Sequence, residues 1–428
     1  PGKPSDDLWT SAKSNTSYRS MVTRETSDIN SDIPWRSPRL QVILASSLIG
    51  VMGVSLLSPV LPALRSTFAI TDAQVGLIIT VYTFPGIVLT PFVGLAADRI
   101  GRRRTLVPLL LLFGIAGAGI ALTDTFRQVL ILRFVQGIGA SALVTLAITL
   151  AGDYYEGRRQ RAVIGLNSSA LGTGAAIYPL VGGVLAGVRW ELPFVFFGVS
   201  IFVGLAAFVV IDDQQPRKAE SLRTYTDRIR HVATEPKAFG IYLAAFSTFF
   251  LYYGGVLTAL PLLLADQYGV VEPYLGLILA VVSITNAFVA AFYGRIQAVT
   301  SLGSLIAMGF SLFGLALLGV RVAASPVHIA ALLVVYGVGF GVVMPSLNSA
   351  VVSIATADHR ASMLGIQTSM LRVGQTLGPI VFPGLAQAAF PTTVIGYRTV
   401  LPAFGAVSLL IGIGTIVVST VKGMSVAK

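Results

Sequence analysis

The fold of this chain is decided by the stretch Gly-Leu-Ala-Ala-Asp-Arg-Ile-Gly-Arg-Arg-Arg at residues 94–104. Four arginines and one aspartate lie here between two apolar runs, residues 73–97 and 105–123. An α-helix needs roughly 20 predominantly apolar residues to cross a bilayer, and both runs approach or exceed that length. Arginines close to the end of a span stay on the cytoplasmic side. The stretch therefore predicts a short cytoplasmic turn between two membrane-spanning helices.

The composition places the whole chain in a membrane. Its 428 residues are 54% hydrophobic and 11% charged, and its mean hydropathy is +0.79, whereas soluble domains carry about 25% charged residues. A net charge of +11 would suggest nucleic acid in a soluble protein. Here the arginines lie in loops, where membrane topology and anionic lipid explain them. We therefore expect the protein to contact membrane lipid and not to bind nucleic acid.

Chemistry that needs a metal or a cofactor is not predicted. The chain has no Cys, and its three His lack metal-ligand spacing. It has no Gly-x-x-x-x-Gly-Lys-Ser/Thr phosphate loop, so ATP is not the expected energy source. The spans contain no pair of nucleophile and base. We therefore expect no cofactor, no metal and no enzymatic activity.

The arginine-rich turn also carries a recognisable pattern. It reads Gly-x-x-x-Asp-Arg-x-Gly-Arg-Arg, with matches at Gly94, Asp98, Arg99, Gly101, Arg102 and Arg103. In this place, after the second of many apolar spans, it resembles the signature loop of the major facilitator superfamily. A loop that merely collects arginines would not explain the aspartate or the two glycines. The resemblance implies an all-α integral membrane fold of twelve transmembrane helices in two pseudo-symmetric six-helix bundles.

The apolar runs divide the chain into five parts. We expect a disordered cytoplasmic tail at 1–36, a first six-helix bundle at 37–211, a cytoplasmic linker at 212–238, a second bundle at 239–421 and a short cytoplasmic tail at 422–428. In the linker, apolar residues recur at helical spacing among arginines, which suits either a helix on the membrane surface or a plain linker. The twelve expected spans are 40–64, 73–97, 105–123, 128–152, 162–188, 192–211, 239–265, 274–298, 302–324, 326–355, 361–390 and 399–421.

The distribution of basic residues predicts the orientation. Of the 30 Lys and Arg, 23 fall on the side of the 94–104 turn, five on the opposite side, and two, Arg133 and Arg372, inside spans. Such a bias marks the cytoplasmic side. We expect a multi-pass protein of the plasma membrane, with both termini in the cytoplasm.

The two halves of the chain are related by a shift of 200 residues. Chance glycine matches are an objection in a chain with 44 glycines, but several span pairs keep one register. Duplicated six-span halves around a central site are how such transporters alternate access. The matched pairs are Gly76 and Gly276, Gly94 and Gly294, Gly137 and Gly337, Gly139 and Gly339, Gly165 and Gly365, Gly174 and Gly374, and Pro179 and Pro379.

Arg133 lies inside the fourth span, where insertion scales put a central arginine at about +2.5 to +3.5 kcal/mol. The run Arg133-x-x-Gln136-Gly137-x-Gly139 resembles the fourth-span motif of the same superfamily. In proton-coupled members of the superfamily the arginine of this motif takes part in proton transfer, so the resemblance implies such a role for Arg133. The alternative is an arginine that extends to the membrane surface.

The fifth span resembles the antiporter motif of the superfamily, which implies an exporter of the drug/proton antiporter branch. One departure is Tyr178, which replaces the glycine expected before the proline and places a phenol near the cavity or the interface of the halves. The alternative is generic packing of small residues. The motif residues are Gly165, Gly174, Pro179, Gly182 and Gly183, and in the second half Gly374, Gly378 and Pro379.

A conformational network is implied at the cytoplasmic face. The resemblance implies that Asp98, Arg102 and Asp153 join there and hold one conformation. Exposed ion pairs are worth only about 0–1 kcal/mol, but a few kcal/mol suffice to bias two states. The alternative is that these are ordinary topology charges.

Arg372 is unusual because it falls near the middle of the eleventh span, while no acidic residue lies in the core of any span. Two embedded arginines without an embedded acid indicate a site that tolerates or prefers negative charge. The alternative is that Arg372 hydrogen-bonds helix carbonyls near the kink at Pro379. Other polar or aromatic candidates for a cavity are Tyr82, Asn167, Tyr178, Tyr252, Tyr253, Asn286, Tyr336, Asn348, Gln367 and Gln375. Any of these could instead tie two helices together.

We therefore expect a monomeric secondary transporter that works by alternating access and exports small amphiphilic compounds in exchange for protons. The first alternative is a carrier of an organic anion or a metabolite, or a lipid-linked flippase, that uses Arg133 and Arg372. A non-transporting membrane receptor is the second alternative. The proton-carrying residue is the open question, since an arginine does not readily lose its proton.

Overall fold

The structure is a computed structural model, and it describes residues 33–212, 236–356 and 359–426. Within these ranges every regular element is helical, as expected for a fold that must satisfy its backbone hydrogen bonds inside lipid. The expected tail at 1–36 lies mostly, and the linker almost wholly, outside the described residues. The first described segment, residues 33–37, leads directly into the first helix.

The first bundle contains six spans, several of which are broken. The first span bends at Pro59 and Pro62, and the fourth is interrupted at Ser141 and Ala142. The elements are α2 (Pro38–Ser55), η1 (Ser58–Val60), α3 (Leu61–Thr67), α4 (Asp72–Ile100), α5 (Arg102–Gly119), η2 (Ile120–Leu122), α6 (Phe126–Ala140), α7 (Leu143–Tyr154), α8 (Gly157–Val188), α9 (Leu192–Phe196) and α10 (Val199–Val210).

The second bundle contains six further spans. Its first span includes a nine-residue π-helical segment, η3, which the sequence did not predict. The elements are α12 (Pro236–Phe250), η3 (Leu251–Ala259), α13 (Leu260–Tyr268), α14 (Glu272–Val299), α15 (Leu302–Gly319), α16 (Pro326–Ile354), α17 (Arg360–Ala389) and α18 (Thr393–Val426).

Helix ends follow local sequence rules. Thr71 and Gln74 form a capping box at the start of α4, and Thr125 and Gln128 form another at the start of α6. Gly101, with φ of 103°, is the single residue between α4 and α5, and this backbone conformation favours glycine. Among the residues that the structure describes, eleven spans are long and apolar enough to cross a membrane. The twelfth is α17, which is long enough at 30 residues but carries polar side chains.

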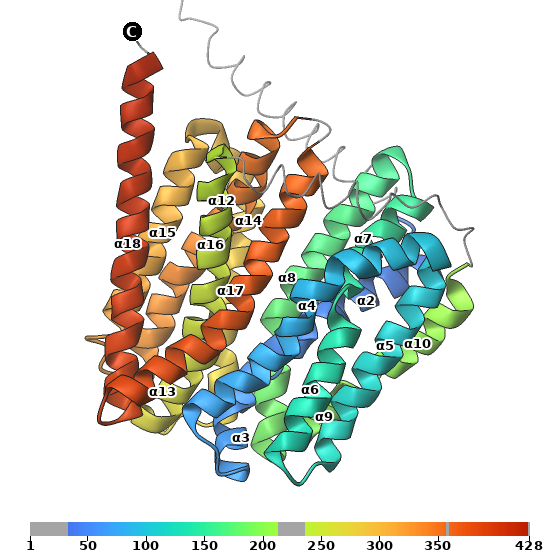
Figure 1. Cartoon of the computed structure of the whole chain (residues 1–428), viewed down its shortest axis with the longest axis horizontal. Coiled ribbons are helices and arrows are strands. Elements are labelled where there is room, and N and C mark those ends of the chain that lie inside the picture. The colour runs from blue at the N-terminus through green and yellow to red at the C-terminus, as the bar shows by residue number, and fades with distance from the viewer. Residues whose placement is uncertain (1–32, 213–235, 357–358, 427–428) are drawn as a thin grey trace, which may run out of the picture.

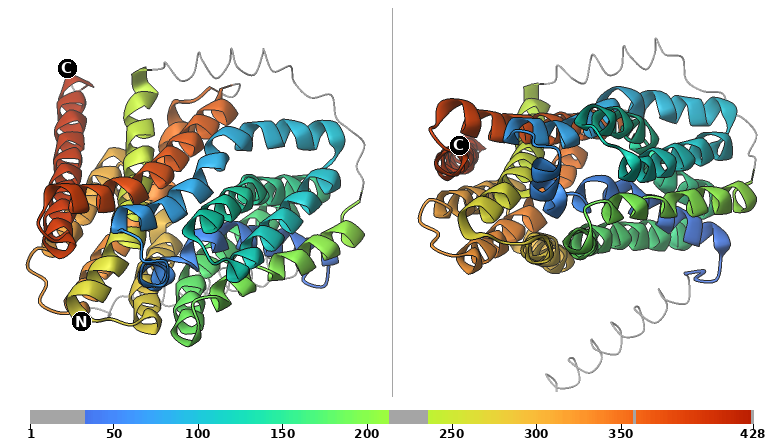
Figure 2. Two further views of the ribbon diagram at one scale, coloured as in Figure 1. Left: turned by 60° about the horizontal axis from the view of Figure 1, so that its bottom comes forward. Right: turned by 90° about the horizontal axis from the view of Figure 1, so that it is seen from below.

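The two bundles lie side by side and separate toward the top of the view in Figure 1, where the C-terminus lies. We call the opposite end, which carries Arg65, Asp72 and Asp266, the Arg65 end. The end that carries Asp98, Arg102 and Asp153 is called the Arg102 end. Figure 2 shows the same two bundles from other directions, with the first half of the chain mainly on the right of each view and the second half mainly on the left. Bonds between the bundles near the Arg65 end include Ser58 Oγ to the Leu257 carbonyl at 2.5 Å and Thr80 Oγ1 to the Thr376 carbonyl at 2.7 Å.

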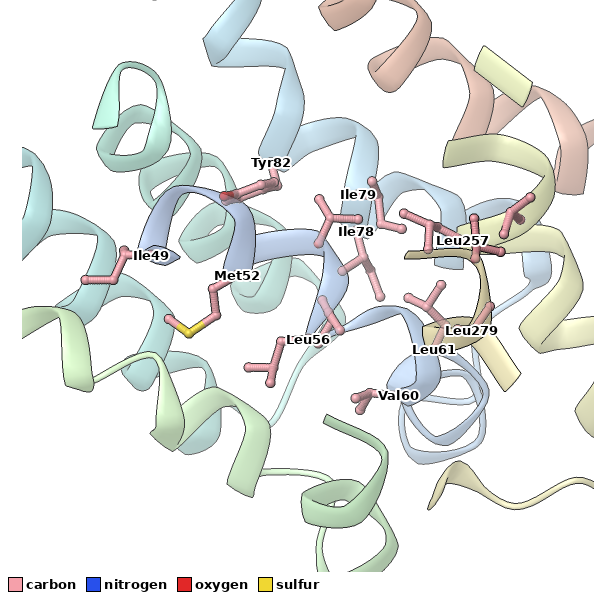
Figure 3. Close-up of a cluster of buried hydrophobic side chains, with 14 of the residues drawn as sticks. Ile49, Met52, Leu56, Val60, Leu61, Ile78, Ile79, Tyr82, Leu257 and Leu279 are labelled. Atoms are coloured by element: carbon pink, nitrogen blue, oxygen red, sulfur yellow. The ribbon is translucent and has the colours of Figure 1, made fainter. Parts of the chain in front are cut away.

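Buried apolar side chains continue from one bundle into the other near the Arg65 end. In Figure 3, Leu61 of the first bundle lies beside Leu257 and Leu279 of the second. All three side chains are at most 1% exposed. This shared core joins the halves below the level at which the bundles separate.

Glycines allow the bundles to touch through their backbones in two places related by the 200-residue shift. A Cβ at Gly76 would overlap the carbonyl oxygen of Pro379, and a Cβ at Gly276 would overlap the carbonyl oxygen of Pro179. The first contact joins α4 to α17, and the second joins α14 to α8. The two-fold relation of the halves is therefore confirmed in the packing of their interface.

We predict that Gly76→Ala destabilises the protein by about 1 to 3 kcal/mol, because the added methyl group forces the bundles apart. The thermal denaturation midpoint of the detergent-purified protein measures this. Gly384→Ala on α17, where nothing lies within 4 Å of the new Cβ, is the matched control. Equal loss in both variants would show that the close approach at Gly76 is not required.

Candidate functional site

A cavity of about 290 Å³ lies between the two bundles. It sits midway along α4 and α17, so it would lie near the middle of a membrane. Most of its lining is apolar, and Arg372 is the one charged residue among the described residues that line it. The lining residues on which the argument below depends are Tyr82, Thr83, Gly86 and Ser141 from the first bundle and Phe249, Tyr253, Arg372 and Gln375 from the second.

The guanidinium of Arg372 crosses from the second bundle to the first. Its Nη2 donates to the carbonyl oxygen of Ser141 at 3.1 Å. Its Nη1 lies so close to Gly86 that a Cβ there would overlap it, and the guanidinium would have to move to make room. Its Nε is buried and has no hydrogen-bond partner. The observed bond thus goes to a carbonyl of the other bundle and not to the kink of its own helix at Pro379.

The acceptor for Arg372 is exposed because the fourth span is broken. α6 ends at Ala140 and α7 begins at Leu143, which leaves the Ser141 carbonyl outside the helical bonding pattern. Thr90 Oγ1 also donates to this carbonyl, at 2.7 Å. Sequence reasoning missed Ser141, although the run of small residues at 137–142 was a signal. Broken helices with free carbonyls are a recurrent feature of transporter binding sites.

Arg133 does not line the cavity. It is fully buried inside the first bundle, where it donates to the carbonyls of Gly53 at 2.9 Å and Ile78 at 3.2 Å and to Gln136 Oε1 at 2.7 Å. Its guanidinium carbon lies 4.1 Å from the centre of the Tyr82 ring, a cation–π contact. Tyr82 thus contacts both Arg133 and the cavity. In this state Arg133 joins α2, α4 and α6, and it does not extend to the surface.

The equivalent place in the second bundle is aromatic. Two hundred residues after Arg133 and Gln136 stand Leu333 and Tyr336. The Tyr336 ring stacks on Phe313 at 4.4 Å, and Tyr252 packs against Tyr336 at 6.3 Å. Tyr252 and Tyr336 are therefore members of an aromatic core and not of the cavity lining.

The π-helical segment η3 brings Tyr253 to the cavity. Thr258 Oγ1 donates to the Tyr253 carbonyl five residues earlier, at 2.7 Å. π-Helical turns are rare and occur frequently at functional sites. Ser58 of the first bundle binds a carbonyl of the same segment, at Leu257, so η3 is also part of the interface.

The structure brings Asp98, Arg102 and Asp153 together at the Arg102 end. Arg102 Nη2 lies 2.7 Å from Asp98, and its Nε donates to Asp153 at 3.0 Å. All three residues belong to the first bundle, so these bonds tie α4, α5 and α7 together. Arg103 packs 4.3 Å from the Phe208 ring of α10. Arg99 is exposed, and nothing lies within 4 Å of a Cβ built on Gly94.

A different charged group joins the two bundles at the Arg65 end. We call this group, which consists of Arg65, Asp72, Asp266 and Tyr397, the latch. Arg65 donates to Asp72 at 2.7 Å within the first bundle and forms an ion pair with Asp266 of the second. Tyr397 of the second bundle donates to Asp72 at 2.8 Å. Sequence reasoning missed the latch because its members lie at span ends and are far apart in the chain.

The remaining polar candidates do not meet at the cavity, except Gln375, which lines it. Gln367 Nε2 donates to Asn348 Oδ1 at 3.0 Å, which ties α17 to α16. Asn167 is buried on α8, and its Oδ1 has no partner. Tyr178 is partly buried and packs against the apolar core that the two bundles share. Asn286 is half-buried on α14, and its carbonyl lies close to Gly341.

The glycines of the expected antiporter motif serve mainly as close helix contacts. A Cβ at Gly182 would overlap the Leu56 carbonyl, and a Cβ at Gly183 would overlap the Glu272 carbonyl of the second bundle. In the second half, Gly374 and Gly378 approach carbonyls of α12 in the same way. Gly165 differs, because nothing lies within 4 Å of its Cβ position.

The sequence profile described as Major Facilitator Superfamily matches residues 43–379 and 241–423. These matches cover well over half of the chain, and the chain belongs to the Major Facilitator Superfamily. Membership confirms the family resemblance, the twelve-helix fold and a role in transport rather than enzymatic catalysis. The chain is a multi-pass membrane protein with small-molecule substrates.

Two of the relatives have names that describe export. The bacillibactin exporter of Bacillus subtilis (strain 168) is 26% identical over 361 residues, which cover 80% of this chain and 88% of the exporter. The multidrug efflux protein YfmO of the same strain is 28% identical over 361 residues, covering 82% and 87%. The quinolone resistance protein NorA of Staphylococcus aureus (strain N315) is 25% identical over 169 residues, covering 39% and 43%.

Solved structures share the fold. A bacterial homologue of the human lysosomal transporter Spinster, in an inward-facing and unoccupied conformation, superposes with a TM-score of 0.70 at 18% identity, covering 89% of this chain and 95% of the other. The nucleoside transporter NupG superposes with a TM-score of 0.73 at 15% identity, covering 89% and 99%. At these identities the likeness establishes the fold alone.

We predict that Arg65→Gln shifts the protein toward separation of the bundles at the Arg65 end by about 1 kcal/mol, roughly a fivefold change in the ratio of states, because the latch is partly exposed. The chain has no cysteine, so spin labels can be attached through Thr67→Cys and Val322→Cys and their distance measured by pulsed electron paramagnetic resonance. Arg127→Gln is the control. It removes an exposed arginine that the predicted topology places on the same side of the membrane as Arg65, and it should leave the distances unchanged. An unaltered distance distribution in Arg65→Gln would rule out the latch.

Proposed function

We propose that this transporter exports small amphiphilic compounds by alternating access, in exchange for protons. The cavity between the bundles is the observation that carries the proposal. It combines an apolar lining and the aromatic side chains of Tyr82, Phe249 and Tyr253 with a few polar groups, as small-molecule sites do. Two relatives whose names describe exporters match four fifths of the chain, which supports the outward direction.

Alternating access needs a cavity that opens to one side at a time. We place both termini and the Arg102 end in the cytoplasm of a cell with this protein in its plasma membrane, as the basic residues predict. The Arg65 end then faces outward, and the latch and the contact of Gly76 with Pro379 close it. The described state is thus one closed to the outside. The chain is proposed to act as a monomer, with lipid around both bundles.

The proton site is proposed to lie in the latch. Arg133 is held by Gly53, Ile78 and Gln136 in a state suited to a permanent cation. Asp72 and Asp266 are carboxylates at the interface of the bundles. Across this interface, Asp72 accepts a hydrogen bond from Tyr397, and Asp266 forms an ion pair with Arg65. Loss of the Asp266 charge would break the ion pair with Arg65 that crosses the interface, and this would favour opening toward the outside.

A carrier of organic anions, a metabolite or a lipid-linked substrate is the second candidate. One observation favours it, because the only charge in the described cavity lining is the positive charge of Arg372. Such a carrier would use the same cavity and the same change of access. Transport of matched cationic and anionic compounds separates the two.

The proposal predicts that an inside-acid pH gradient accelerates uptake of substrate into proteoliposomes, because protons leave as substrate enters. A fluorescent lipophilic cation and an organic anion are each measured with and without the gradient. Asp266→Asn should lose most of the gradient effect and retain downhill transport. The control is Asp124→Asn, which removes an exposed carboxylate that the predicted topology places on the same side of the membrane as Asp266.

The result separates the parts of the proposal. Rates that do not respond to the gradient, for either compound, would contradict proton coupling. A gradient effect that survives in Asp266→Asn would place the proton site elsewhere.

A further inference from the structure

We propose that the cavity binds the anionic group of its substrate at Arg372, so that the substrates are amphiphiles that pair an aromatic body with a carboxylate or a similar anion. This rests on the proposed function and names the substrate class for the same site. Nothing in the names of the relatives assigns a role to this arginine. The inference depends on charge balance, on the free donors of the guanidinium and on the aromatic lining.

Arg372 differs from Arg65, Arg102 and Arg133 in having less compensation for its charge. Arg65 and Arg102 each contact two carboxylates. Arg133 has no carboxylate partner, but it donates to three acceptors and lies over an aromatic ring. Among the described residues, the Arg372 guanidinium donates to one acceptor, the neutral carbonyl of Ser141. A cation inside a membrane protein is costly unless an opposite charge or full hydrogen bonding compensates it.

No residue that lines the described cavity is an Asp or a Glu. The protein therefore supplies the positive charge, and the compensating negative charge is left to the substrate. The buried Nε of Arg372 has no partner, so the guanidinium retains donor capacity. A carboxylate is the natural partner, because its two oxygens match the planar donors of an arginine.

The neighbouring side chains define the rest of the substrate. Tyr82 and Tyr253 line the cavity from opposite bundles, and Phe249 adds a third aromatic side chain. These residues favour an aromatic or otherwise apolar body next to the anion. A small neutral polar solute would make few favourable contacts with this apolar lining, and a cation would be repelled by Arg372.

The same bond links binding to the position of the bundles. Arg372 belongs to α17 and Ser141 to the break between α6 and α7, so their hydrogen bond joins the two halves at the level of the cavity. A substrate anion competes with the Ser141 carbonyl for this guanidinium. Binding thus replaces a contact between the bundles with a contact to the substrate, which gives the two states different affinities.

The test is a binding measurement with three probes that share one fluorophore and differ in charge. Dansylglycine is an anion, dansylglycinamide is neutral, and dansyl-ethylenediamine is a cation at pH 7. Each is titrated into the full-length protein in lipid nanodiscs, and the fluorescence of empty nanodiscs is subtracted. The expected result is binding of the anion about 10-fold tighter than the amide, the size of a charge-assisted hydrogen bond, and weaker binding of the cation.

Variants locate the effect. Arg372→Gln should abolish the preference for the anion and leave binding of the amide nearly unchanged, while Arg372→Lys should retain part of the preference. Arg321→Gln removes an equal charge from an exposed position and should behave as the unaltered protein. Gly86→Ala, which displaces the guanidinium, should weaken anion binding without changing net charge.

Three outcomes would overturn the inference: no binding of the anion above empty nanodiscs, binding of the cation or the amide as tight as that of the anion, or an anion preference that persists in Arg372→Gln. If Arg372→Gln does not fold, the inference is tested by comparing the three probes on the unaltered protein and on Gly86→Ala. The measurement uses no gradient and no transport. A failure here therefore leaves proton-coupled export standing, and a failure of gradient-driven transport leaves anion binding standing.

Discussion

The interface of the two bundles depends on the close approach of Gly76 to Pro379 and of Gly276 to Pro179. Packing in a membrane gains little from the hydrophobic effect, because lipid tails are as apolar as the side chains. Backbones that touch through glycines obtain dense van der Waals contact instead. The latch and the shared core at Leu61, Leu257 and Leu279 add to this contact at the same end. Within the described residues, these contacts concentrate the interface of the bundles near the Arg65 end.

The polar groups of the interior are divided between two roles. Arg133 is enclosed by acceptors of its own bundle and stabilises the packing of α2, α4 and α6. Arg372 lies at the boundary between the bundles, and its Nε has no hydrogen-bond partner. The two arginines look alike in the sequence, since each is a single charge within an apolar run. Their difference comes from the neighbours that folding provides, because a guanidinium is inert where it is saturated and available where it is not.

Much of the fold could be predicted from the sequence. The turn at 94–104, the lengths of the apolar runs and the 200-residue repeat predicted twelve helices in two related bundles. The ion pairs of Arg102 with Asp98 and Asp153 also lie where the family resemblance placed them. The candidate cavity was predicted less well. Arg372, Tyr82, Tyr253 and Gln375 line it, whereas Arg133, Tyr252 and Tyr336 are enclosed within single bundles.

The sequence by itself determined the membrane spans, because crossing a bilayer requires long apolar runs and the length of those runs is a local property. It also determined which positions have small residues or prolines, and hence where helices can touch or bend. Tertiary structure alone decided which polar side chains meet. The latch joins residues more than 300 positions apart, and the Ser141 carbonyl meets Arg372 across 231 positions. Such contacts depend on how two bundles dock, and no local pattern encodes that docking.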